Sequence, residues 1–310
     1  MLTNEPHKTI VGYLGLLDDM KLYYRSPWKD VTNNYHRGFL YIGLALYAEA
    51  YGDTEIRDAC SRHLKSFVDK NGNFVYKVKF SDQALIGAAY CSMYRQTKDS
   101  IYKKAAYNLL SFLKERDNPD TGIMYREPAE WQYCDVLGMT IPFLMEFHNT
   151  FNDSIAQSMA YRNFNIYYTY GVDKETGIPS HGYNIKNHIK LGSMNWGRGI
   201  GWYLLAASYL PNFSDTILNK NIQMMEYEQF VGTPEGSFFD SSTALLFEIY
   251  KTSKKLPTKN ILFMQPHTLK DGSITDISGE TYFLNKYSLI KGESEIGNGL
   301  LMMLLAKKKL

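Results

Sequence analysis

A short turn signature recurs along this chain of 310 residues, and it constrains the fold more than any other feature. Each copy is an Asp followed by Ser or Thr, and it stands between two apolar-rich runs. An Asp, Ser or Thr in this place can accept hydrogen bonds from the free N–H groups that begin the next helix. We therefore expect a helix hairpin at each of four corners: Asp53-Thr54, Asp99-Ser100, Asp153-Ser154 and Asp215-Thr216.

The spacing of the corners indicates a repeat. They are 46, 54 and 62 residues apart, as in architectures built from repeated helix pairs. The run before each corner is apolar nearly all round, which is typical of a buried helix, and the run after it has a polar face. Two further hairpins are predicted. One starts near Asp240, and the other pairs a terminal helix at 297–306 with an outer helix at 10–24.

Six hairpins whose first and last helices pair predict an all-α fold, a closed (α/α)6 barrel in which residues 1–310 form one domain. An open solenoid of stacked hairpins is the alternative. Residues 73–78 and 281–289 are interpreted as short strands or extended loops. The buried helices are expected to start near residues 34, 82, 135, 196, 240 and 293.

Charge and composition argue against several classes of partner. The formal net charge is only +2, and basic residues are interspersed with acidic ones, so no nucleic-acid partner is expected. No apolar run approaches the roughly 20 residues that cross a membrane. The three cysteines, Cys60, Cys91 and Cys134, lack metal-type spacing. The first residues lack a secretory pattern, so a soluble cytoplasmic protein is expected, of unknown oligomeric state.

The segment Trp196–Trp202, Trp-Gly-Arg-Gly-Ile-Gly-Trp, carries the strongest functional signal. Trp196 and Trp202 offer flat faces that can stack on a sugar ring. Arg198 is a planar donor fork that suits a carboxylate. The three glycines allow a ligand or another helix to approach the backbone. A tightly packed helix start with buried aromatic side chains is the alternative, and spacing alone leaves both open.

In a closed ring, the starts of the buried helices point to one mouth, where their positive ends favour an anionic ligand. Asp82 and Asp240 could serve there or could simply cap helices. Asp135 precedes a heavily apolar segment, and burial there would raise its pKa, as suits a general acid. Two carboxylates, Asp82 and Asp135, beside tryptophans indicate glycosidic chemistry. The other polar residues at these starts are His36, Arg37, Arg198, Ser241, Glu293 and Asn298.

From about residue 33 to the C-terminus, the chain resembles the unsaturated rhamnogalacturonyl and unsaturated glucuronyl hydrolases of glycoside hydrolase families 105 and 88. The most specific motif is Trp196–Trp202, which is similar to Trp-Gly-Arg-Gly-Asn-Gly-Trp. The turn 181–184, His-Gly-Tyr-Asn, resembles the family's His-Gly/Ala-Trp-Asp turn. The segments 34–38, 82–87, 133–143 and 291–299 resemble its inner helices.

The resemblance implies an (α/α)6 barrel without a cofactor or metal. It implies an oligosaccharide substrate with an anionic 4,5-unsaturated uronate at its nonreducing end, cleaved by hydration of the vinyl ether. Asp135 would protonate C4 and then activate the water that adds at C5, and Asp82 would orient the ring. The remaining candidates would bind or wall the uronate: His36, Tyr133, His181, Trp196, Arg198 and Trp202.

Some residues depart from the family pattern. Ile200 replaces an Asn, Asn184 an Asp and Gln83 a common His, while Tyr133 and Tyr183 stand where Trp is common. Two other functions therefore stay open. One is another carbohydrate enzyme, a glycosidase or an epimerase of surface-polysaccharide metabolism. The other is a non-catalytic sugar-binding homologue.

Overall fold

Buried helices follow one another around a closed ring in the computed structural model, which describes residues 35–125, 129–233 and 235–309. Each inner helix contacts the next, and the last contacts the first. This closure excludes the open solenoid and confirms the predicted (α/α)6 fold. Within the described ranges the inner helices are α2 (Tyr35–Tyr51), α4 (Gly87–Thr97), α6 (Cys134–Phe151), α8 (Gly197–Ser208), α10 (Ser241–Ser253) and α11 (Glu295–Lys309).

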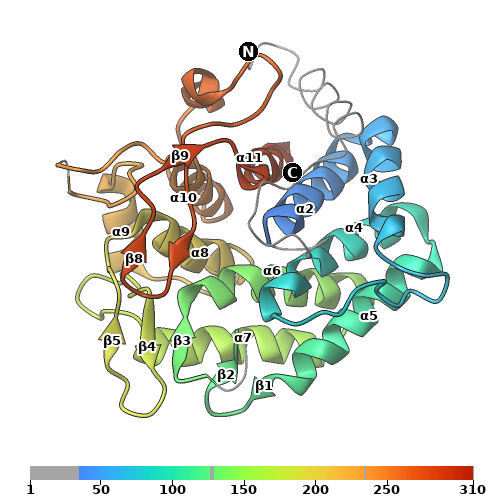
Figure 1. Cartoon of the computed structure of the whole chain (residues 1–310), viewed down its shortest axis with the longest axis horizontal. Helices are drawn as coiled ribbons and strands as arrows, with labels where there is room; N and C mark the ends of the chain where they lie inside the picture. The colour runs from blue at the N-terminus through green and yellow to red at the C-terminus, as the bar shows by residue number, and fades with distance from the viewer. Residues whose placement is uncertain (1–34, 126–128, 234, 310) are drawn as a thin grey trace.

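Outer helices lie on the periphery of this ring (Figure 1). The first three outer helices along the chain pack against α2, α4 and α6, the inner helices that precede them. The fifth hairpin closes with a 3-10 helix, η2 (Ile261–His267), rather than an α-helix. The outer helix predicted at residues 10–24, and the helix start predicted near residue 34, lie outside the described residues. The outer α-helices are α3 (Thr54–Ser66), α5 (Ser100–Glu115), α7 (Ser154–Tyr170) and α9 (Thr216–Met224).

The predicted corners are helix N-caps. At each corner the aspartate side chain accepts a backbone N–H group two or three residues ahead, at 2.8–3.0 Å. Such a cap satisfies donors that the first turn of a helix otherwise leaves free. The interpretation of the repeat is therefore confirmed at all four positions: Asp53, Asp99, Asp153 and Asp215.

The seam that closes the ring, between α2 and α11, is built on two facing glycines. A Cβ atom on Gly43 would lie 2.2 Å from the carbonyl oxygen of Gly299. A Cβ atom on Gly299 would lie 2.1 Å from the carbonyl oxygen of Phe39. Because real side chains cannot approach backbone so closely, only glycine permits this contact between the two helices.

Short strands occupy the connections that enter the inner helices. The strands β3 (Trp131–Tyr133), β4 (Gly182–Asn184) and β5 (Lys190–Leu191) form one antiparallel sheet, and β3 runs directly into α6. The predicted extended segment at 281–289 is a hairpin, whereas 73–78 makes only a bridge between Val68 and Phe74. The remaining strands pair as β1 (Asp117–Asn118) with β2 (Gly122–Ile123), β6 (Ile277–Ser278) with β9 (Lys291–Gly292), and β7 (Thr281–Tyr282) with β8 (Lys286–Tyr287).

Two further properties concern only the part of the chain that the structure describes. There, no helix has both the length and the apolar character needed to cross a bilayer. The same residues include no group of three or more His, Cys, Asp or Glu side chains placed to hold a metal ion.

Candidate active site

The first turn of α6 and the strand β4 bring Asp135 and His181 together. Strand β3 pairs with β4 so that Tyr133 lies opposite Gly182, and the N–H group of Cys134 donates to the carbonyl oxygen of His181 at 3.0 Å. As a result, His181 Nε2 lies 3.2 Å from Asp135 Oδ2. The His181 side chain is 3% exposed and that of Asp135 is 20% exposed. Asp135 therefore forms the accessible side of the pair, and His181 supports it from within.

Three aromatic rings surround His181. The ring centroid of Trp196 lies 4.4 Å from that of His181, and Tyr133 approaches edge-on at 6.0 Å. Tyr287, in β8, lies 5.8 Å away and also contacts Trp196. The strands β3, β4, β5 and β8 lie on one side of the molecule (Figure 1). The predicted residues Tyr133, His181 and Trp196 thus form one cluster with Asp135.

Of the two predicted catalytic residues, Asp82 is the one with the buried carboxyl group. It is 5% exposed and lies inside the 3-10 helix η1 (Ser81–Ile86), so it is not the N-cap. The hydroxyl of Tyr125 donates to Asp82 Oδ2 at 3.4 Å, while Oδ1 has no hydrogen-bond partner among the described residues. Burial raises the pKa of Asp82 to about 7, although Tyr125, the N–H group of Gln83 and His36 act to lower it.

This finding corrects one expectation. The sequence predicted that Asp135 would be buried, because an apolar segment follows it. Instead, Asp135 is partly open and Asp82 is buried. The neighbours of Asp135 in the first turn of α6, Cys134 and Val136, are buried as the apolar segment indicated, and only the Asp135 side chain between them is partly exposed.

Asp240 has the alternative role that the sequence allowed, that of a helix cap. It accepts from the N–H and hydroxyl groups of Ser242 at 2.9 and 2.6 Å and from the hydroxyl of Ser278 at 2.7 Å. Its neighbours are also structural. Ser241 donates to Thr275, and the amide of Asn298 holds the backbone of the loop before β6.

His36 binds a carboxylate of the protein itself. Its Nε2 lies 2.6 Å from Oε1 of Glu280, and the hydroxyl of Tyr35 donates to Oε2 at 2.7 Å. Burial raises the pKa of Glu280, but His36, Arg198 and Tyr35 outweigh it and hold the pKa at about 2. The Glu280 side chain is therefore an anion, and it is 45% exposed.

Arg198 lies beneath the turn that carries Glu280. Its two terminal nitrogens donate to the backbone carbonyl oxygens of Ser278, at 2.6 Å, and of Gly279. The side chain is buried, and the guanidinium carbon lies 5.8 Å from the centre of the Trp196 ring. The guanidinium group thus binds main-chain oxygens in this structure, and it fixes the position of the turn that carries Glu280.

Trp202 is placed with the core rather than with the Asp135 cluster. Its ring is 1% exposed and stacks on Phe39 with centroids 4.9 Å apart. The glycines of the motif also serve packing: a Cβ atom on Gly199 would meet the ring of Trp196 at 2.3 Å, and one on Gly201 would meet Leu246 at 2.5 Å. Much of the motif is therefore a tightly packed helix start.

The residues that depart from the family pattern have local structural roles. The side-chain oxygen of Gln83 accepts the N–H groups of Lys79 and Phe80, at 2.6 and 3.1 Å. That of Asn184 closes the turn between β4 and β5. Tyr183 is buried against Tyr167, and Ile200 belongs to the core. Glu293 is exposed, and Glu295 is the buried acid at the start of α11, with Arg37 Nε 3.9 Å away.

Sequence reasoning missed three residues that contact the predicted ones: Tyr125 at Asp82, Glu280 at His36, and Tyr287 at His181. All three lie in connections between helices and belong to no motif or repeat. Their common feature is a position shortly before an inner helix, in a segment that the repeat does not describe. Residue type did not distinguish Tyr125 or Tyr287 as site residues, because the chain contains 25 tyrosines.

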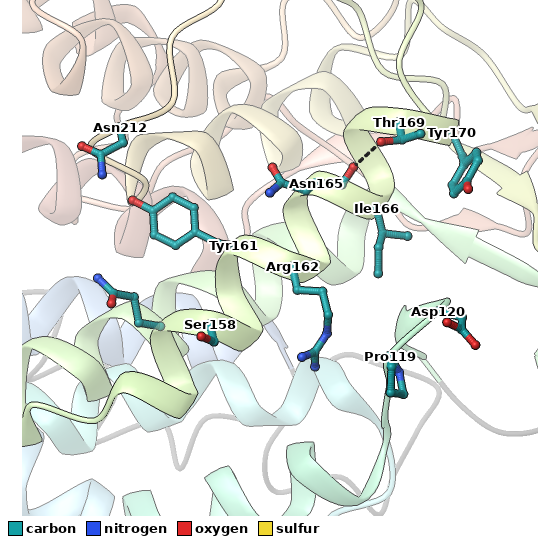
Figure 2. Close-up of a pocket in the computed structure, with 11 residues that line it drawn as sticks. Pro119, Asp120, Ser158, Tyr161, Arg162, Asn165, Ile166, Thr169, Tyr170 and Asn212 are labelled. Atoms are coloured by element: carbon teal, nitrogen blue, oxygen red, sulfur yellow. Dashed lines mark hydrogen bonds between the residues drawn. The ribbon is translucent and has the colours of Figure 1, made fainter.

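A separate groove lies on the outer surface, along α7. Figure 2 shows Tyr161, Arg162 and Asn165 on one face of this helix, with Pro119 and Asp120 of the β1–β2 turn beside them. Arg162 forms an ion pair with Asp117 there. None of the predicted site residues lines this groove, which therefore differs from the cluster around Asp135.

A helical ring with carboxyl groups at the starts of its inner helices defines a class, the six-hairpin enzymes that act on carbohydrates. The comparison with known families specifies it further: residues 18–233 match the model of Glycosyl Hydrolase Family 88, and the chain belongs to that family. The protein is therefore a glycoside hydrolase.

Solved structures agree on the fold. A possible member of glycoside hydrolase family 105 from Klebsiella pneumoniae superposes with a TM-score of 0.81 at 15% identity, covering 100% of this chain and 94% of that one. A family 105 hydrolase from C. acetobutylicum gives 0.75 at 17% identity, with 96% and 98% covered. An alpha-1,6-mannanase from Salegentibacter gives 0.68 at 16% identity, with 97% and 98% covered. The same helical ring therefore serves more than one glycosidic reaction.

Proposed function

We propose that the protein releases a 4,5-unsaturated uronic acid from the nonreducing end of oligosaccharides that polysaccharide lyases produce. The observation that carries this proposal is the pair of Asp135 and His181 at the start of α6, with its carboxylate partly open and its histidine buried. Membership of family 88 and the motif Trp196–Trp202 support it.

The proposed reaction is hydration of the vinyl ether. Asp135 gives its proton to C4, and positive charge develops at C5 beside the ring oxygen. The Asp135 carboxylate then accepts a proton from the water that adds at C5. The hemiketal so formed opens and releases the partner sugar, so no separate acid is required for the leaving group.

The other candidate residues would bind and orient the substrate. Asp82, with a pKa near neutrality, can donate a hydrogen bond to a sugar hydroxyl or accept one from it. Tyr133 and Trp196 would line the site of the sugar ring, and His36 with Glu280 would contact polar groups of the substrate. Arg198 would act on an anionic substrate through its positive charge and through the turn that it holds.

An epimerase is less well supported by the geometry. Such an enzyme would be expected to place two histidines together, but His36 pairs with Glu280 and His181 pairs with Asp135. The two imidazoles are thus engaged with two different acids.

The proposal is tested with two disaccharides that share the same linkage. One carries a lyase-generated unsaturated uronate, and its matched control carries the saturated uronate. Loss of the ultraviolet absorbance of the conjugated double bond, with release of the partner sugar, is expected for the first only. Cleavage of the saturated disaccharide would instead indicate an ordinary glycosidase, and binding without turnover of either would indicate a non-catalytic homologue.

A further inference from the structure

The hydroxyl of Tyr287 stands behind the Asp135–His181 pair and has three hydrogen-bond partners. The N–H group of Ser193 lies 2.9 Å from this oxygen, and so does the carbonyl oxygen of Leu284. The third partner is Nδ1 of His181, at 3.2 Å. Tyr287 belongs to β8, so the hairpin β7–β8 brings this hydroxyl to the cluster.

The number of hydrogens available determines the direction of each of these three hydrogen bonds. A backbone N–H group can only donate, a backbone carbonyl oxygen can only accept, and a tyrosine hydroxyl has a single hydrogen. That hydrogen must therefore go to Leu284, while the oxygen accepts from Ser193. Toward His181 the oxygen can only accept, so Nδ1 of His181 carries a proton.

The proton on Nδ1 has a consequence for the other ring nitrogen. In a neutral imidazole with hydrogen on Nδ1, Nε2 carries a lone pair, yet Nε2 faces the Asp135 carboxyl oxygen at 3.2 Å. Two lone pairs at this distance repel, so the contact requires a proton between Nε2 and Oδ2. The thiol of Cys134, 3.5 Å from the same oxygen, is only a weak donor. The pair therefore holds a proton in common.

We infer that Tyr287 is a positioning residue for the acid of this enzyme. By fixing the tautomer of His181, it makes the Asp135–His181 pair retain the proton that Asp135 delivers to C4. The proton balance then closes, because the water that adds at C5 returns one proton to the pair. This inference rests on the proposed function, and it assigns a catalytic consequence to a residue of a short strand outside every motif.

The test is the variant Tyr287→Phe, which removes the hydroxyl and keeps the ring against Trp196 and Phe230. Without the acceptor, His181 can move its hydrogen to Nε2 and donate to an unprotonated Asp135. We expect kcat to fall about 10–100-fold, by analogy with the loss of partners that orient metal-bound histidines, with KM changed by less than about twofold.

The matched control is Tyr209→Phe, because the Tyr209 hydroxyl is buried without a hydrogen-bond partner among the described residues. Its kcat should equal that of the wild type. An unchanged kcat in folded Tyr287→Phe would overturn the inference.

A spectroscopic measurement tests the tautomer directly. In protein labelled with 15N at histidine, the His181 signal is identified by its loss in His181→Asn. We expect a protonated Nδ1 in the wild type and a population protonated only at Nε2 in Tyr287→Phe. An unprotonated Nδ1 in the wild type would overturn the inference, even if the variant did not fold. Because these spectra need no substrate, failure of the proposed reaction is recognised separately by the disaccharide assay.

Discussion

Asp135 and Asp82 both lie near the start of a buried helix, yet their surroundings differ. Asp135 is accessible and paired with a histidine, whereas Asp82 is buried with one oxygen lacking a partner among the described residues. Residue type and helix position were enough to select both from the sequence. The difference between them was not predictable, because burial depends on segments 40 or more residues away, such as the one that carries Tyr125.

Replacing Asp135 with Asn should abolish turnover while sugar binding persists. The amide cannot transfer a proton, and loss of a general acid typically costs about 10²–10⁴-fold in rate. The measurements are kcat on an unsaturated disaccharide and calorimetric binding of the same compound. Asp120→Asn, on the outer groove (Figure 2), is the control and should keep full activity. Near-normal turnover in a folded Asp135→Asn protein would contradict the assignment.

Asp82 should make the free energy of unfolding depend on pH. Because its folded pKa is raised to about 7 from 3.8, its contribution is fully present below pH 3.8 and is lost as the pH rises toward 7. At about 1.4 kcal/mol per pKa unit, the loss is at most about 4 kcal/mol. Asp82→Asn should therefore gain stability relative to the wild type between pH 5 and pH 8, as measured by urea unfolding.

Asp240→Asn is the matched control for this experiment. Asp240 is equally buried, but its oxygens accept several hydrogen bonds, so the amide should destabilise the fold. A difference between Asp82→Asn and wild type that does not change with pH would show that Asp82 titrates as an ordinary exposed carboxyl group.

At the scale of elements, the helix corners were predictable and the connections were not. A cap such as Asp53 uses donors two or three residues ahead, so local sequence specifies it completely. The turn that presents Glu280 is instead held by Arg198, about 80 residues earlier in the chain. No local pattern encodes such a contact, and the sequence therefore indicated a carboxylate ligand where the structure has main-chain oxygens.

Arg198→Lys should weaken binding of anionic saccharides more than that of neutral ones. Lysine keeps the charge but cannot span the carbonyl oxygens of Ser278 and Gly279 as the planar fork does, so the positive charge that favours an anionic saccharide is no longer held in place. We expect Kd for an anionic saccharide to rise about tenfold, equivalent to about 1.4 kcal/mol. Arg57→Lys, at a surface ion pair, is the control. If binding of anionic and neutral saccharides weakens equally, Arg198 has a structural role only.

At the scale of the whole molecule, the closed ring was predicted from the spacing of the corners and from the terminal apolar helix. The close contact between α2 and α11 was not predictable, because it depends on facing glycines that are 256 residues apart. Gly43 and Gly299 carry no signal of their own in the sequence. That residues 1–310 form one domain remains a prediction.

The seam yields a test of ring closure. Gly299→Ala places a methyl group into the backbone of α2, and overpacking of this kind typically costs about 1–3 kcal/mol. Helix propensity alone would give the opposite sign, since Ala favours a helix by about 1 kcal/mol over Gly. Gly292→Ala, where a Cβ atom meets nothing within 4 Å, is the control. We expect the thermal midpoint to fall for Gly299→Ala and to stay unchanged for Gly292→Ala. An unchanged midpoint for Gly299→Ala would show that Gly299 does not lie against the backbone of α2.

The same seam sets the order of events during synthesis of the chain. Helix α2 is made before the other described helices, whereas its neighbour α11 is the last of them to leave the ribosome. Until then, the flanks of α2 and α10 that α11 will cover remain exposed apolar surface. Contacts so distant along the chain form slowly, and the unfinished ring is open to aggregation. We therefore expect nascent chains stalled before residue 295 to engage chaperones, and completed chains to be released from them.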